Sequence, residues 1–95
     1  MYLIAKHPYI KIQREVSSLE QRDIELDRTI YLYSEKVVSE YNEFPVNDVF
    51  DMSYRFFGRE RGILYIHTGK GVYPYTVKSS PEAFVKAYKQ HIKGQ

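Results

Sequence analysis

The sequence predicts an α+β fold that is mainly β. We expect an antiparallel meander of six or seven strands, forming a bent sheet or a partly open barrel that one C-terminal helix closes. Two observations support this class. Apolar residues alternate with polar ones at period two along most of the chain, and the spacing becomes helical only from residue 80 onward. The length of 95 residues predicts a single domain, residues 1–95.

The first half of the chain contains three segments with the composition of strands. Ile10 and Ile12 alternate with Lys11 and Gln13 in the first of them. The segment 17–28 has few apolar anchors and fits either a short helical turn or another strand. Pro45 breaks any sheet ladder in the link that follows, because proline lacks an amide donor. The strand segments are residues 9–16, 29–33 and 36–41, and the link is 43–48.

The second half predicts three strands joined by short glycine-containing turns. Residues 49–56 place Phe50, Met52, Tyr54 and Phe56 on one face, which is the pattern of a half-buried strand. The sequences GRERG and TGKG predict turns before and after the next strand. Short connections favour antiparallel neighbours. The three strands are residues 49–56, 63–67 and 72–77.

The Gly-Lys-Gly sequence around Lys70 invites comparison with a phosphate-binding loop. Such a loop requires a Ser or Thr after the lysine and a helix after the loop. Here Gly71 follows Lys70, and a strand follows Gly71. We therefore interpret this sequence as the tip of a hairpin, in which Gly69 and Gly71 supply positive φ angles.

The C-terminal segment predicts an amphipathic helix. Ser80 is a suitable N-cap, Pro81 suits the first helical position and Gly94 suits the end. Glu82 near the start and lysines near the end complement the helix dipole. The apolar stripe that we expect to close the core consists of Phe84, Ala87, Tyr88 and Ile92.

This order of strand, glycine turn, strand, glycine turn, strand, Ser-Pro cap and helix resembles the small bacterial pleckstrin-homology-like (PH-like) domains. The resemblance covers about residues 29–93. It implies a PH-like fold and a binding role, because it brings no catalytic motif. The chain departs from the family in two ways. It has no Trp in the closing helix, and the basic motif of the phosphoinositide-binding members is missing after Lys6 and Lys11.

Composition argues against several chemistries. The chain has no cysteine, which excludes disulfides, thiolate zinc sites and a cysteine nucleophile. The three histidines lack the spacing of a metal site, and no pair of carboxylates is set apart as acid and base. We therefore expect no enzyme activity, cofactor or metal. We also expect a cytoplasmic protein, since the N-terminus is no signal peptide and no run is long enough to span a bilayer.

Basic residues around the GRERG turn form the first candidate site. The net charge of +2 hides a balance of −4 over residues 1–54 and +6 over residues 55–95. Arg59 and Arg61 belong to one turn, Arg55 ends the preceding strand, and we expect the turn at residues 34–35 to bring Lys36 to the same end of the sheet. These four residues would bind anionic lipid headgroups or nucleic acid. The alternative is a charged turn that is simply solvated.

The ten tyrosines suggest the second candidate site. Tyr73 and Tyr75 alternate with Val72, Pro74 and Thr76, so an inward aliphatic face would leave a tyrosine surface outside. Tyrosine is enriched at protein interfaces, and the alternative is cross-strand aromatic pairing that stabilises the sheet. Pro74 also predicts an edge strand, which would allow self-association. The leading interpretation is a non-enzymatic module that binds a protein partner; the alternative is a binder of anionic surfaces.

Overall fold

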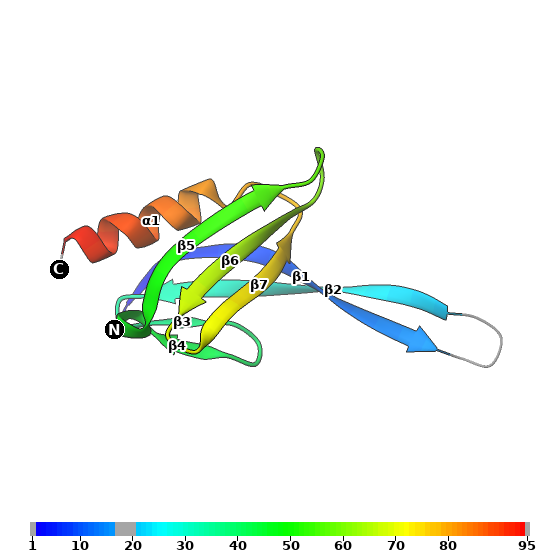
Figure 1. Cartoon of the computed structure of the whole chain (residues 1–95), viewed down its shortest axis with the longest axis horizontal. Coiled ribbons are helices and arrows are strands. Elements are labelled where there is room, and N and C mark those ends of the chain that lie inside the picture. Colours follow the sequence, from blue (N-terminus) through cyan, green and yellow to red (C-terminus); the bar gives the residue numbers. More distant parts are fainter. Residues whose placement is uncertain (1, 17–20, 95) are drawn as a thin grey trace.

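The computed structural model describes residues 2–16 and 21–94, and these form one antiparallel sheet followed by one helix (Figure 1). The predicted α+β fold, mainly β with seven strands and a single C-terminal helix, is thereby confirmed. The strands are β1 (Leu3–Val16), β2 (Gln21–Tyr33), β3 (Lys36–Val38), β4 (Glu43–Pro45), β5 (Val49–Phe56), β6 (Gly62–Thr68) and β7 (Gly71–Val77), and the helix is α1 (Glu82–Lys93).

The strands are arranged in the order β4-β3-β2-β1-β7-β6-β5, so two meanders meet at β1 and β7. This corrects the expectation of one continuous meander. A 3₁₀ turn of three residues, Val46–Asp48, connects β4 at one edge of the sheet to β5 at the other edge. Three residues span about 10 Å, whereas seven flat strands would separate the two edges by about 29 Å. The sheet therefore bends strongly, which brings its edges together.

The core lies on the concave side of this bend, where α1 packs against β1 and β5. Phe84 and Tyr88 are almost completely buried, as the closing-helix prediction requires. The Tyr88 hydroxyl donates a hydrogen bond of 2.8 Å to the Val49 carbonyl, and burial raises the pKa of Tyr88 to about 12. Other core residues include Ile30, Leu32, Val37, Phe44, Met52, Leu64, Ile66 and Val77.

The helix differs from the prediction at its first residue and in the exposure of its last apolar residue. It begins at Glu82, so Pro81 lies just before the first helical residue and is buried. The Ser80 hydroxyl accepts a hydrogen bond of 3.3 Å from the Glu82 amide. Val85 is buried, whereas Ile92 in the last turn is 36% exposed. Within the described residues, no helix is long and apolar enough to cross a bilayer.

The strand β5 has the predicted bounds but not the predicted face. Val49 and Met52 are buried, whereas Phe50 is 70% exposed. The cause is an irregularity in the pairing with β6, where the register shifts between Val49 and Asp51. A bulge of this kind reverses the direction of the side chains on one side of it, so Phe50 faces outward instead of joining Met52.

The hairpin of β1 and β2 projects well beyond the rest of the molecule (Figure 1). Its register runs from Leu3↔Tyr33 to Val16↔Gln21, and the molecule measures 54 × 27 × 23 Å. Both strands are longer than predicted, and β2 begins at Gln21 within the segment that the sequence left open. The rest of the open segment, residues 17–20, lies outside the described residues. We call residues 11–16 and 21–26 the arm.

Candidate functional site

The junction between the two meanders is the least paired part of the sheet. Strand β7 pairs with β6 continuously from Gly62↔Val77 to Thr68↔Gly71, but it pairs with β1 only at Ile10↔Thr76. Beyond that position the two strands diverge. Within the described part of the chain, no strand pairs with β1 from Lys11 onward on its β7 side.

A cavity of about 270 Å³ lies where the strands diverge. The turn between β3 and β4, residues 39–42, closes one side of it. We call this site the β1–β7 seam. Two of its apolar side chains face solvent, because Tyr41 is 73% exposed and Ile12 is 47% exposed. The seam is lined by Tyr9, Ile10, Lys11, Ile12, Ser39, Glu40, Tyr41, Asn42, Pro74, Tyr75 and Thr76.

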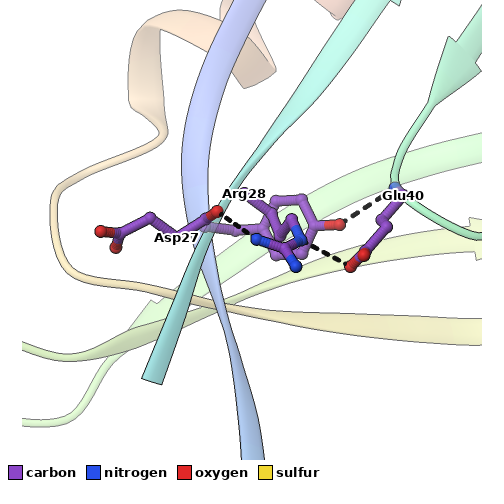
Figure 2. A network of polar contacts seen from close by, with 4 residues as sticks. Asp27, Arg28 and Glu40 are labelled. Carbon is purple, nitrogen blue, oxygen red and sulfur yellow. Dashed lines mark hydrogen bonds and ion pairs between the residues drawn. The ribbon is translucent and has the colours of Figure 1, made fainter. Parts of the chain in front are cut away.

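Polar contacts fix the β3–β4 turn against the hairpin of β1 and β2. Figure 2 shows the Arg28 guanidinium between the Glu40 carboxylate, with 2.8 Å between Nε and Oε2, and the Asp27 carbonyl, also at 2.8 Å. The Glu40 amide donates to the Tyr9 hydroxyl over 3.1 Å. The hydrogen bond from Arg28 holds the pKa of Glu40 below its usual value. The turn is therefore held from β2 as well as from β1.

Further contacts hold the turn against β7. The Ser39 amide donates to the Asn42 carbonyl over 2.8 Å and closes the turn. The Ser39 hydroxyl and the Tyr75 hydroxyl form a buried hydrogen bond of 2.8 Å. Burial raises the pKa of Tyr75, so this phenol stays protonated at neutral pH. Because the turn is fixed on both sides, the seam is a preformed site.

The exposed end of the seam combines an aromatic ring with charge. The Lys11 ammonium lies 4.1 Å from the centre of the Tyr41 ring, which is a cation–π contact. Among the lining residues, Lys11 carries a positive charge and Glu40 a negative charge, and Glu40 is paired with Arg28 outside the lining. The seam thus offers an apolar platform and free strand edges beside the ammonium of Lys11.

The structure overturns the predicted orientation of the tyrosines of β7. Tyr75 is 7% exposed and packs edge-on against Tyr9, with 4.9 Å between the ring centres. Tyr73 packs against Phe44 at 4.7 Å. The outward positions belong to Val72, Pro74 and Thr76. Large rings fill the core of this small protein, and Ser39 provides the partner that a buried phenol needs. Strand β2 has the reverse arrangement, since Ile30 and Leu32 are buried and Tyr31 and Tyr33 face the other way.

Strand β7 is also not an edge of the sheet, since it lies between β1 and β6. The prediction from Pro74 is wrong in this respect. Pairing with β1 at a single position nevertheless leaves the stretch around Pro74 without a ladder partner on the β1 side, among the residues described. A proline suits this stretch because no β1 carbonyl there requires an amide donor.

The four basic residues do not gather as predicted. Arg61 pairs with Glu25 on β2, and Lys78 reaches the same carboxylate at 2.7 Å. These contacts, first from Lys78 and then from Arg61, lower the pKa of Glu25. The Arg55 guanidinium lies 5.5 Å from the centre of the Phe57 ring. Arg59 is exposed and makes no ion pair with any described residue.

Lys36 lies at the opposite end of the sheet from Arg59, which is a second correction. It pairs with Glu43, and Glu43 lines the same small cavity as Lys70 at the tip of the β6–β7 hairpin. The expectation failed because it took residues 43–48 as a link, whereas Glu43–Pro45 form the additional strand β4 between the turn at residues 34–35 and β5. The chain instead contains two meanders with a bend between them.

The hairpin interpretation of the Gly-Lys-Gly sequence is confirmed. Gly69 and Lys70 connect β6 to β7. The Thr68 hydroxyl accepts from the Lys70 amide at 3.1 Å and donates to the Gly71 carbonyl at 2.9 Å. Gly71 has a φ of +133°, but Gly69 does not have a positive φ; the other positive φ is at Gly58. The Lys70 side chain is exposed at the tip.

The three histidines lie apart, and each forms a hydrogen bond within the fold. His67 forms a hydrogen bond of 2.9 Å with the Ser53 hydroxyl on β5. His7 donates to the Ser79 carbonyl at 3.2 Å, and His91 donates to the Ser34 carbonyl at 2.7 Å. Across residues 2–16 and 21–94, no three His, Asp or Glu side chains are placed to hold a metal ion.

Sequence reasoning missed the turn that closes the seam, with Ser39, Glu40 and Tyr41, and the residue Arg28 that holds this turn. The only available signal was the polar sequence Ser-Glu-Tyr-Asn after a β-branched pair, which is typical of a turn. Its position against β1 and β7 depends on long-range packing. A comparison of the chain with models of known protein families finds no match, and a search of curated proteins finds none either.

Proposed function

We propose that this chain is a non-enzymatic, PH-like binding module that takes up an extended segment of a protein partner at the β1–β7 seam. The observation that carries the proposal is the single pairing between β1 and β7, Ile10↔Thr76, beyond which both strand edges are available. The PH-like part of the proposal is supported by the element order of seven antiparallel strands and one closing helix.

Strand addition explains how such a seam would bind. An extended segment forms main-chain hydrogen bonds with a free strand edge, and its alternate side chains enter neighbouring pockets. In the seam, the ring of Tyr41 and the side chain of Ile12 would contact different apolar side chains of the segment, because Ile12 and the Lys11 that touches Tyr41 point to opposite faces of β1. Lys11 would favour an acidic residue beside it. Because the turn 39–42 is already fixed, binding would cost little ordering entropy.

Selection of binding peptides tests this proposal. Random peptides displayed on phage are selected for binding to the intact chain. The dissociation constants of the selected peptides are then measured by isothermal titration calorimetry with wild type and with Tyr41→Ala. We expect Tyr41→Ala to weaken binding by about fivefold or more, the loss of an interface aromatic worth about 1 kcal/mol. Tyr2→Ala is the matched control, since Tyr2 is 65% exposed and does not line the seam.

The outcome that contradicts the proposal is equally specific. Peptides that bind Tyr41→Ala as tightly as wild type, or that perturb NMR signals of α1 instead of the seam, would assign binding to another surface. Weak salt dependence is expected, because main-chain and apolar contacts dominate.

The prediction of anionic-surface binding has less support from the geometry. Arg61 is already paired with Glu25, and Lys36 lies at the other end of the sheet. It stays a prediction that liposomes containing anionic lipid and single-stranded DNA can test. Phosphate contacts would give binding that weakens steeply with salt, and Arg59→Ala/Arg61→Ala would remove that binding.

A further inference from the structure

We infer that the segment taken up by the seam is the carboxyl-terminal end of a partner chain, with its terminal carboxylate at Lys11. The inference rests on the proposed function, since it names the partner of the same site. It starts from the shape of the seam, which is closed at the end where β1 and β7 pair and open at the end where they diverge.

The closed end of the seam stops a strand that runs along β1. Ile10 pairs with Thr76 at this end. Next to that pair, the rings of Tyr9 and Tyr75 pack edge-on with 4.9 Å between their centres, and both side chains are 7% exposed. From Lys11 onward, the β7 side of β1 has no partner strand among the described residues. A segment that pairs with this free edge must therefore end, or turn away, when it reaches Ile10.

A segment beside β1 runs in one of two directions. In an antiparallel pairing its carboxyl end lies at the closed end of the seam, and in a parallel pairing its amino end lies there. Antiparallel ladders are slightly more stable per residue than parallel ones. The two ends of a chain also carry opposite charges, so the charge at the closed end of the seam favours one direction.

The charge at the closed end is positive. The Lys11 ammonium lies 4.1 Å from the centre of the Tyr41 ring, and it makes no ion pair with any described residue. Glu40 is the acidic residue of the lining, and Arg28 neutralises it over a distance of 2.8 Å between Nε and Oε2. A terminal carboxylate would therefore be attracted to this end, whereas a terminal ammonium would be repelled by Lys11.

A buried hydroxyl provides a second donor at the same end. The Tyr9 hydroxyl accepts a hydrogen bond of 3.1 Å from the Glu40 amide, and Tyr9 lines the cavity. Its own proton has no acceptor among the described residues. Tyr9 and Lys11 project from the same face of β1, because they are two residues apart. An ammonium and a phenol can thus both donate to one carboxylate.

Apolar surface is available for the last side chains of the partner. The residue opposite Lys11 points to the face of β1 on which Tyr41 lies, and the residue opposite Ile12 points to the other face. Tyr41 is 73% exposed and Ile12 is 47% exposed, so each offers contact area. We therefore expect apolar side chains at the last two positions of the partner chain.

Two matched peptide libraries test the inference. Both contain the same random residues, which end in a free carboxyl group in the first library and are fused through that end to the carrier protein in the second. Selection on the intact chain should enrich binders from the first library. These peptides are then synthesised with a free carboxylate and with a carboxamide, and isothermal titration calorimetry measures both dissociation constants. Amidation should weaken binding about tenfold or more, because a charge-assisted hydrogen bond is lost.

Three variants assign this effect to particular side chains. In Lys11→Gln the free and amidated peptides should bind about equally, because the charge that distinguishes them is gone. Lys6→Gln is the matched control, since Lys6 is an exposed lysine of β1 outside the seam, and this variant should keep the full difference. Tyr9→Phe retains the ring and should reduce the difference in part. Circular dichroism melting curves confirm that each variant is folded.

Equal binding of free and amidated peptides by wild type would overturn the inference and leave strand addition in place. A preference for the free carboxylate that persists in Lys11→Gln would also overturn it. The proposed function fails separately, when the selected peptides bind Tyr41→Ala as tightly as wild type. The absence of binders from both libraries would contradict the proposed function and the inference together.

Discussion

The body of the sheet and its projecting arm share two strands but differ in how those strands are covered. In the body, β1 and β2 contribute buried residues such as Ile30 and Leu32 to a core that α1 closes. In the arm, the same strands have no third strand beside them among the described residues, and Ile12 is half exposed. The difference separates the part of these two strands that stabilises the fold from the part next to the surface that we propose for binding.

Removing the Phe84 side chain, which closes the core of the body, should have the largest effect on the free energy of unfolding. Phe84 is 2% exposed, so Phe84→Ala should lower the free energy of unfolding by about 3–5 kcal/mol, as for other buried aromatics. Chemical denaturation followed by circular dichroism measures this change. The control is Ile92→Ala on the same helix, whose side chain is 36% exposed and should matter far less. Equal losses in the two variants would mean that the helix does not close the core.

Two isoleucines mark where the body ends and the arm begins. Ile10 is 5% exposed and Ile12 is 47% exposed, although they are two residues apart on the same face of β1. Ile10→Ala should lower the free energy of unfolding by about 2 kcal/mol or more, and Ile12→Ala by less than about 1 kcal/mol. The same denaturation experiment measures both. A larger loss for Ile12 would place the boundary further along the arm.

Acid should loosen the body through His7. Burial is the main cause that lowers the pKa of His7, and the hydrogen bond to Ser79 partly opposes it. The unfolded chain therefore binds a proton at a higher pH than the folded chain, near the ordinary histidine pKa of about 6.5. Stability should fall as the pH decreases through that value. Denaturation at pH 7.5 and pH 5.5 should show a smaller difference for His7→Gln than for wild type, whereas an unchanged difference would exclude His7.

The strands and the helix were predictable because each depends on a local pattern. Residues 49–56 form a strand with the predicted bounds, and Phe84 and Tyr88 close the core from the predicted helix. The directions of side chains were less predictable. Phe50 faces outward because of a bulge, and bulges depend on the partner strand rather than on the strand's own sequence.

Most of the candidate site could not be predicted from the sequence. Tyr75 points inward because Ser39, which is 36 residues away, offers a buried hydrogen bond. Arg28 and Glu40 meet only because β3 folds back beside β2. Lys36 was misplaced because Glu43–Pro45 form a strand beside β3, although Pro45 made this segment look like a link. Long-range packing decided each of these positions.

Amide hydrogen exchange across the seam tests the central claim most directly. In dilute protein, the amides among Lys11, Ile12 and Gln13 that point away from β2 have no strand partner and should exchange fast. The amides from Leu64 to Ile66 on β6, a strand that is paired on both sides, should exchange slowly. A bound peptide should slow the seam amides and leave β6 unchanged. Seam amides that are as protected as β6 in dilute protein, or that stay fast when a partner binds, would contradict an open strand edge at this site.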